Sequence, residues 1–211
     1  MTAAVLSVHG SSTATHAASG RIGPNAIIRM VEALDDLEGK GAGARLLERS
    51  GLSRYIGRLP EAMVDEAEVI ALHRAVREAV GEGRAETLAW LAGRKTADYL
   101  LAHRIPKAMQ RVLTILPAPL AARVLLAAIS RHAWTFAGSG RFRVVSHAPV
   151  TVEIADCPLA RGIAADRPAC GYFAATLERL FAVLVHPDVR VRETACTATG
   201  APACRFEARW R

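Results

Sequence analysis

The side chains with the clearest metal-binding chemistry lie in the last quarter of the chain. Cys170 precedes a helical pattern, and Glu193 lies three residues before Cys196, which the turn-forming segment T-A-T-G-A-P-A separates from Cys204. The flanking runs alternate like strands, so a hairpin would bring the thiols of Cys196 and Cys204 together across its tip. The dipole and backbone N–H groups at a helix start favour a thiolate at Cys170. Two thiolates on a hairpin, one at a helix start and one carboxylate form a candidate four-ligand zinc set.

The same residues have other interpretations. Free cysteine is often buried as a small apolar side chain, and the spacing is not the C-x-x-C of a zinc ribbon. On an ideal strand Glu193 and Cys196 face opposite sides, so joint ligation requires a bulge or the start of a turn between them. Disulfides are a weaker alternative, because no export signal accompanies the cysteines. Spacing alone leaves a metal site and buried core thiols both open.

The composition indicates a globular protein with a basic surface. With 211 residues, 51% of them apolar, the chain is long enough for one domain with a substantial core or at most two small ones. The formal charge is +7, and most cations are arginines scattered through helical patterns. This scatter argues against a nucleic-acid-binding arm, and no recognition-helix motif supports that class. It favours an acidic partner or a carboxylate-bearing ligand.

The start of the chain and its most apolar stretch bear on location. Residues 1–20 are small, polar and uncharged and lack the pattern of a signal peptide, so we predict a disordered leader followed by one domain over residues 21–211. The segment from Ile115 to Ile129 contains two prolines and Arg123 and is too short to span a bilayer. We therefore expect a soluble, cytoplasmic protein without a transmembrane segment, and leave peripheral contact with a membrane open.

The patterning predicts helices followed by a small antiparallel sheet. Two β-rich runs around Ala148-Pro149 follow Gly138-Ser139-Gly140, then comes a helix after Cys170, and the chain ends in a hairpin. A helical layer with a small sheet, and one helix laid across that sheet, is an α+β fold. The predicted helices of the first part run from Pro24 to Leu37, Ala44 to Arg49, Val64 to Val80, Glu86 to His103, from Pro106 to before Pro117, and from Leu120 to Phe136.

Three segments together resemble a known family. The terminal pattern E-T-A-C-T-A-T-G-A-P-A-C-R-F resembles the closing hairpin of the 4-vinyl reductase domain family, and I-G-P-N-A-I and H-A-W-T-F-A-G-S-G-R-F are similar to its bacteriochlorophyll-biosynthesis members. The resemblance covers residues 21–211. It implies a fold related to a vesicle-tethering subunit and to haem-based gas sensors, and hydrophobic small molecules as ligands.

The resemblance also implies a metal. In phenol-responsive sensors of this family, a Cys, a Glu-x-x-Cys and a further Cys hold a structural zinc, and this pattern maps onto Cys170, Glu193, Cys196 and Cys204. Whether Cys157 replaces one of these ligands stays open.

The family name implies reduction of a vinyl group in photosynthetic pigment synthesis, but no redox-cofactor motif is visible. Hydride transfer requires a nicotinamide, a flavin or an iron–sulfur centre. Gly138-Ser139-Gly140 lacks the third glycine of a dinucleotide fingerprint, and the cysteine spacing fits no ferredoxin-type run. We therefore predict a binding protein without catalytic residues. It would hold a vinyl-bearing magnesium tetrapyrrole, such as divinyl protochlorophyllide, and assist its 8-vinyl reduction or its transfer to another synthesis enzyme. The alternatives are the vinyl reductase itself and a hydrophobic-ligand sensor domain.

We predict the pigment slot between the helical layer and the sheet, away from the zinc. A macrocycle needs an apolar slot, aromatic walls and a cation for its propionate, and His132, Trp134, Phe136 and Arg141 offer these groups. His147 could ligate the central magnesium. Core packing, a solvated arginine and a hydrogen-bonded structural histidine are the alternative interpretation. A homodimer stays open.

Overall fold

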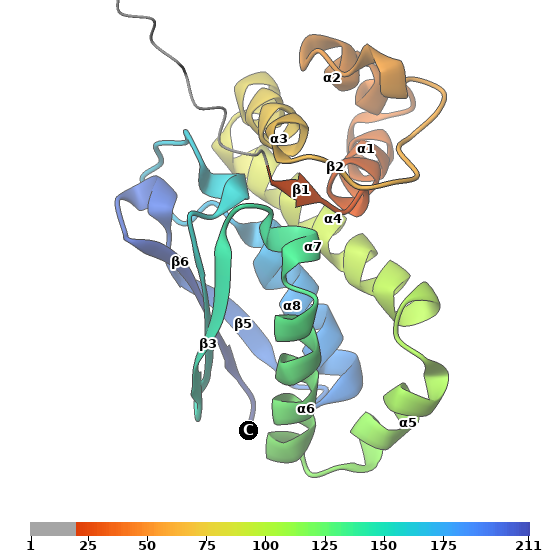
Figure 1. The fold of residues 1–211 in the computed structure, drawn as a ribbon. Coiled ribbons are helices and arrows are strands. Elements are labelled where there is room, and N and C mark those ends of the chain that lie inside the picture. Colours follow the sequence, from red (N-terminus) through yellow and green to blue (C-terminus); the bar gives the residue numbers. More distant parts are fainter. Residues whose placement is uncertain (1–19) are drawn as a thin grey trace, which may run out of the picture.

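The four long strands pair into one antiparallel sheet in the order β3-β4-β6-β5, and the helices gather on one side of it (Figure 1). The structure is a computed structural model that describes residues 20–211, so the predicted leader lies outside the described residues except for Gly20. The expected α+β fold is confirmed. The strands are β3 Arg141–His147, β4 Val150–Ala155, β5 Arg190–Ala195 and β6 Ala203–Arg209.

Eight helices make up most of the remainder of the described chain. They are α1 Asn25–Glu38, α2 Ala42–Arg49, α3 Glu66–Val80, α4 Glu82–His103, α5 Lys107–Ile115, α6 Ala118–Arg131, α7 Trp134–Ala137 and α8 Gly171–Leu184. A second, two-residue antiparallel pair, β1 Arg21–Ile22 with β2 Val64–Asp65, was not expected from the sequence. No helix of the described residues is long and apolar enough to cross a bilayer.

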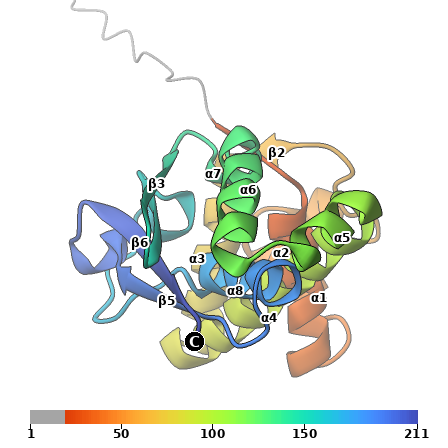
Figure 2. The same ribbon diagram turned by 90° about the horizontal axis from the view of Figure 1, so that it is seen from below.

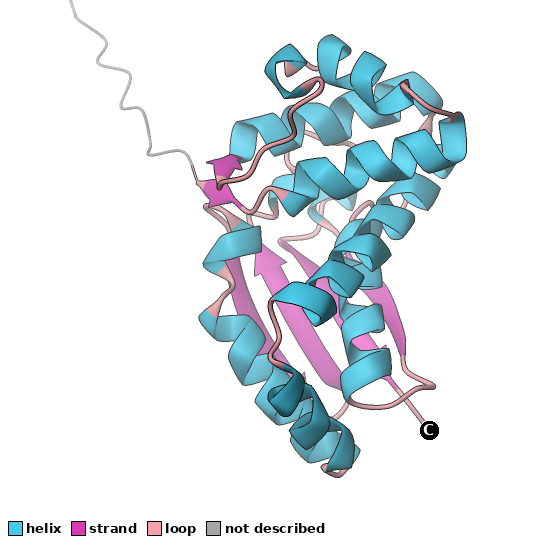
Figure 3. Cartoon of the chain, turned by 90° about the vertical axis from the view of Figure 1, so that its right-hand side faces the viewer, coloured by secondary structure: helices cyan, strands magenta, loops and turns pink. Residues whose placement is uncertain are grey.

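Helix α8 lies between the sheet and α4, as the view from below and the side view both show (Figures 2 and 3). The two helices approach closely at Gly93 of α4, where an added Cβ would lie 2.2 Å from the backbone oxygen of Tyr172. Beside this contact, the hydroxyl groups of Thr96 and Tyr172 lie 2.7 Å apart in the core. A small residue at Gly93 therefore lets α8 pack on α4 and carry its N-terminus to the sheet.

A buried carboxylate joins α3 to the glycine-rich hinge before β3. Glu66 accepts hydrogen bonds from the Ser139 backbone N–H (2.8 Å), the Ser139 hydroxyl (2.7 Å) and Arg161 (2.7 Å). Although burial opposes it, the hydrogen bonds from Ser139 and Arg161 lower the pKa of Glu66. Gly138 has φ +58°, and a Cβ there would lie 2.3 Å from the Glu66 carboxylate, so this hinge position requires glycine.

The sheet has an apolar inner face and a charged outer face. On the outer face, Glu153 of β4 pairs in register with Arg143 of β3 and Arg205 of β6, and both arginines bond its carboxylate, their Nε atoms at 2.7 Å. Burial opposes ionisation of this carboxyl, but the bonds from Arg205 and Arg143 lower its pKa. The inner face packs against α8 and α6 and includes Phe206, which is fully buried.

The predicted helix from Leu120 to Phe136 is wrong at its C-terminal end. Helix α6 ends at Arg131, and α7 is a separate turn that begins at Trp134. The side chain of His132 lies 2.9 Å from the carbonyl oxygen of Ala128, and the Thr135 hydroxyl donates to the His132 carbonyl. These side-chain bonds satisfy carbonyl groups that a continuing helix would use, so the chain turns here.

Candidate metal centre

Four side chains from separate elements converge where the sheet meets the start of α8. Cys170 is the N-cap residue of α8, Glu193 lies in β5, Cys196 follows the end of β5, and Cys204 lies in β6. One ligand atom from each of these residues lies within 4.8 Å of the other three. The structure thus brings together the four residues that the sequence predicted as metal ligands.

A local irregularity lets Glu193 and Cys196 serve one site. The register of β5 against β6 shifts between Glu193 and Ala195, and Cys196 begins a short helical turn, Thr197–Thr199. The pleat of a regular strand would place these two side chains on opposite faces. The register shift and the turn remove that restriction, as the sequence analysis required.

The three sulfur atoms form a closed triangle. Their separations are 3.5 Å for Cys170 to Cys204, 3.7 Å for Cys196 to Cys204 and 3.9 Å for Cys170 to Cys196. A zinc ion with Zn–S bonds of about 2.3 Å in tetrahedral geometry would hold thiolates about 3.8 Å apart. A disulfide requires a sulfur–sulfur distance of about 2.05 Å, and all four cysteines of the chain are free thiols. The triangle therefore has the dimensions of a tetrahedral thiolate site.

Glu193 has the features of a fourth ligand. Its Oε2 accepts a hydrogen bond from the Cys170 backbone N–H at 2.7 Å, whereas its Oε1 is buried and has no partner within residues 20–211. Burial and the negative charge of Cys196 raise the pKa of the Glu193 carboxyl to about 8. Sulfur contacts with Cys157, Cys196 and Cys204, together with burial, raise the pKa of the Cys170 thiol. A dication would reverse both effects and would give Oε1 a partner, so the donor set fits a divalent metal.

The fourth cysteine lies beside this set. The Sγ of Cys157 is 3.6 Å from that of Cys170, but Cys157 does not belong to the group whose ligand atoms all lie within 4.8 Å of one another. The backbone N–H of Thr197 and its hydroxyl lie 3.4 Å and 3.5 Å from the Sγ of Cys204. Cys157 and Thr197 are therefore outer contacts of the sulfur triangle, of the kind that orient ligands in metal sites.

Sequence reasoning missed a second carboxyl group at this site. Glu86 of α4 reaches Gly171, the first residue of α8, where an added Cβ would lie 2.0 Å from its Oε1. Its Oε2 is buried without a partner in the described chain, and burial raises its pKa. An open hollow of about 560 Å³ exposes both Glu86 and Glu193. No local pattern marks Glu86, because its position follows from the crossing of α4 and α8.

The residues predicted to bind a pigment lie along α6, α7 and β3. His132 is exposed at the end of α6, and Trp134, the first residue of α7, is 61% exposed. Arg141 is exposed and forms an ion pair with Asp156 at 2.9 Å. His147 is exposed at the end of β3.

Phe136, in contrast, belongs to the core. Its ring packs edge-on against Phe142 at 5.6 Å between centroids and lies 6.0 Å from Phe173. Phe173 in turn lies 6.3 Å from Phe206 of β6. Phe136 therefore contributes to an aromatic cluster that joins α7, α8 and the sheet.

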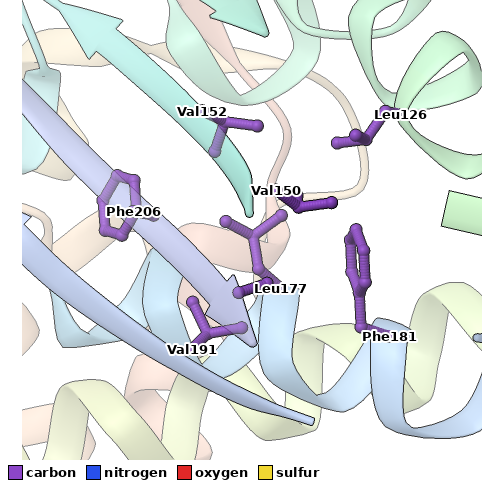
Figure 4. Close-up of a pocket in the computed structure, with 8 residues that line it drawn as sticks. Leu126, Val150, Val152, Leu177, Phe181, Val191 and Phe206 are labelled. Carbon is purple, nitrogen blue, oxygen red and sulfur yellow. The ribbon is translucent and has the colours of Figure 1, made fainter. Parts of the chain in front are cut away.

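An apolar cavity lies between the helices and the inner face of the sheet (Figure 4). Its volume is about 10 Å³, and none of the five predicted pigment residues lines it. Side chains from α6, α8 and three strands converge on it, and none of them is polar. The lining residues are Leu126, Val150, Val152, Leu177, Phe181, Val191, Phe206 and Ala208.

Two solved structures share parts of this arrangement. The phenol-responsive sensory domain of the transcription activator PoxR is 18% identical, with a TM-score of 0.42 over 76% of this chain and 88% of that chain. An H-NOX protein from S. oneidensis is 10% identical, with a TM-score of 0.45 over 87% of this chain and 98% of that chain.

Comparison at the level of sequence identifies the family. The 4-vinyl reductase domain model matches residues 150–210, which include α8, the hairpin and the four candidate ligands. The bacteriochlorophyll synthase 23 kDa chain of Cereibacter sphaeroides is 51% identical over 188 residues, which cover 89% of each chain. The protein of the same name from Rhodobacter capsulatus is 43% identical over 197 residues, 93% of this chain and 91% of that relative. The resemblance found in the sequence is thereby confirmed, and this chain belongs to the family of bacteriochlorophyll synthase 23 kDa chains, with a 4-vinyl reductase domain at its C-terminal end.

Proposed function

We propose that this protein is a non-catalytic accessory protein of bacteriochlorophyll synthesis that binds a vinyl-bearing magnesium tetrapyrrole. It would present the pigment for reduction of its 8-vinyl group or transfer it to another enzyme of synthesis in the cytoplasm. Family membership supports the pathway, because both relatives are named as chains of bacteriochlorophyll synthase. The divinyl form of protochlorophyllide is the pigment that we use as the test ligand.

The observation that carries pigment binding is the apolar cavity beneath α6. All eight lining residues are apolar, as a macrocycle requires, and Leu126 of α6 closes the cavity against α8 and the sheet. A space of about 10 Å³ holds one water molecule at most. Pigment binding therefore requires α6 to move away from the sheet, and Trp134 and Arg141 follow this helix in the chain as an exposed ring and an exposed cation.

We further propose that Cys170, Glu193, Cys196 and Cys204 bind one structural zinc ion. The sulfur triangle and the unpartnered Oε1 of Glu193 support this assignment. Four protein ligands leave no open coordination position, so the metal would stabilise the fold and take no part in chemistry. The ligands would tie the terminal hairpin to the start of α8, the helix that forms one wall of the cavity.

Absorption spectroscopy tests the binding function directly. The purified protein is mixed with divinyl protochlorophyllide, with and without NADPH, and the Soret band and the pigment composition are followed. We expect a shifted Soret band and an unchanged vinyl group. Loss of the 8-vinyl group with protein and NADPH alone would show that the protein is the reductase. An unchanged Soret band at saturating pigment would contradict pigment binding.

A further inference from the structure

Helices α5 and α6 form a hairpin at the end of the molecule farthest from α1, α2 and α3 (Figures 1 and 3). Its tip, I-L-P-A-P-L from Ile115 to Leu120, contains no polar side chain. Ile115 is 81% exposed, the most exposed large apolar residue of the described chain. Four further apolar side chains of the hairpin are 41–46% exposed: Met109, Val112, Leu120 and Val124.

The fold does not account for these exposed side chains. At helical spacing, Met109, Val112 and Ile115 share one face of α5 with Leu113, yet only Leu113 is buried. Helix α6 buries one face through residues such as Leu125 and Leu126 and exposes a second apolar stripe, which includes Leu120 and Val124, on its other side. A helix that is apolar on both sides is expected to be covered on both sides.

The charge around the hairpin is of one sign. Residues 99–152 contain no aspartate or glutamate, but they contain seven arginine and lysine residues. Arg104, Lys107, Arg111 and Arg123 are exposed on or beside the hairpin, and none of them forms an ion pair within residues 20–211. Elsewhere, exposed arginines such as Arg84 and Arg179 pair with a nearby acid. The partner of the hairpin must therefore supply both apolar contact and negative charge.

We propose that the α5–α6 hairpin docks on the surface of an anionic lipid bilayer. The apolar tip from Ile115 to Leu120 enters the boundary between headgroups and acyl chains, while Arg111 and Arg123 lie among the negative headgroups. A second copy of the chain is disfavoured at this face, because it would bring the same unpaired cations together. The surface is independent of the proposed function, since docking requires neither pigment nor zinc.

Sedimentation with sucrose-loaded vesicles tests this surface on the full chain without pigment. One set of vesicles is phosphatidylcholine alone, and the other contains equal parts of phosphatidylcholine and phosphatidylglycerol. We expect binding to the anionic vesicles that weakens as the salt concentration rises. Arg111→Gln and Arg123→Gln should each lower the partition coefficient about fivefold. Ile115→Ser should lower it at least about tenfold, because an inserted apolar side chain is lost.

The loop that follows α2 provides matched controls. Ile56 is 45% exposed and the Arg58 side chain is 85% exposed, so Ile56→Ser and Arg58→Gln remove the same groups from another part of the surface. Both controls should bind vesicles like the unchanged protein. Circular dichroism establishes that every variant is folded.

Three results would overturn the proposal. The first is a protein that stays in the supernatant with both kinds of vesicle, which would point to an acidic protein as the partner of the hairpin. The second is undiminished vesicle binding by the folded Ile115→Ser and Arg111→Gln variants. The third is an equal loss of binding in the Ile56 and Arg58 controls.

Discussion

The Sγ atoms of Cys170 and Cys204 lie 3.5 Å apart although 34 residues separate them in the sequence. One belongs to the first turn of α8 and the other to the last strand of the sheet. Cys196 closes the triangle from the opposite strand of the hairpin. The start of α8 is therefore held at the sheet by side chains alone, at a point where the proposed metal would add direct bonds.

The first prediction concerns this metal. Elemental analysis of the purified protein should find close to one zinc per chain. Cys196→Ser should lose the metal and lower the free energy of unfolding by about 2–5 kcal/mol, less than the roughly 10 kcal/mol of small zinc peptides, because this domain has its own core. Cys157→Ser, which changes a thiol outside the four-ligand group, is the control and should keep its zinc. Metal-free protein of unchanged stability would contradict the assignment.

A second prediction concerns the close approach of α4 and α8. Gly93→Ala would place a Cβ about 2.2 Å from the Tyr172 oxygen, so the helices must separate and the protein should lose about 1–3 kcal/mol of stability. Gly83→Ala in the same helix meets nothing within 4 Å and should stabilise by up to about 1 kcal/mol. Urea denaturation measures both changes. Effects of the same sign would show that the helices do not approach at Gly93 as described.

A third prediction concerns stability in acid. Burial, aided by Arg77, lowers the pKa of His73 to about 4, and its Nε2 lies 3.4 Å from the Ala26 carbonyl oxygen. The unfolded chain binds this proton near pH 6.5, so the contribution of the neutral ring is fully present above that pH. It is lost as the pH falls from about 6.5 to about 4, at a cost of up to about 3 kcal/mol.

Chemical denaturation at pH 7 and pH 5 measures this effect. His73→Gln should reduce the difference in unfolding free energy between the two pH values. His147→Gln, at the exposed end of β3, is the control. An unchanged difference in the folded His73 variant would show that another group governs acid stability.

The fourth prediction locates the pigment. If the exposed indole of Trp134 forms a wall of the slot opened by α6, Trp134→Ala should weaken pigment binding by about 1–3 kcal/mol. Trp90→Ala changes a residue that lines the hollow beside Glu86 and Glu193, and it should leave the affinity unchanged. Titration of the Soret band gives both values. The opposite pattern would place the pigment beside the metal centre.

The parts of the structure that could be predicted depend on local pattern. The terminal hairpin follows from alternating residues around a Gly-Pro turn, and α8 follows from apolar residues at helical spacing after Cys170. Their ends also fix the three thiols, so the candidate ligand set could be named from the sequence. The condition that Glu193 and Cys196 need an irregular strand is a rule of strand geometry, and the register shift meets it.

The parts that could not be predicted depend on tertiary packing. Glu86 and Cys157 reach the centre only because α4 crosses α8 and because the loop after β4 folds back to Cys170. The end of α6 at Arg131 depends on side-chain bonds of His132 and Thr135, which outweigh the helical preference of the following residues. Phe136 was placed in the slot by residue type, whereas its position is set by Phe142 on a neighbouring strand.

The short sequence span of the sulfur triangle bears on the order of folding. Its longest separation is 34 residues, whereas the contact between Thr96 and Tyr172 that joins α4 to α8 closes a loop of 76. Closing the shorter loop costs about 0.7 kcal/mol less chain entropy. Contacts between nearby residues generally form faster than distant ones. Helix α8 and the terminal hairpin can therefore assemble as an early unit, and the N-terminal helices then dock on a surface that already exists.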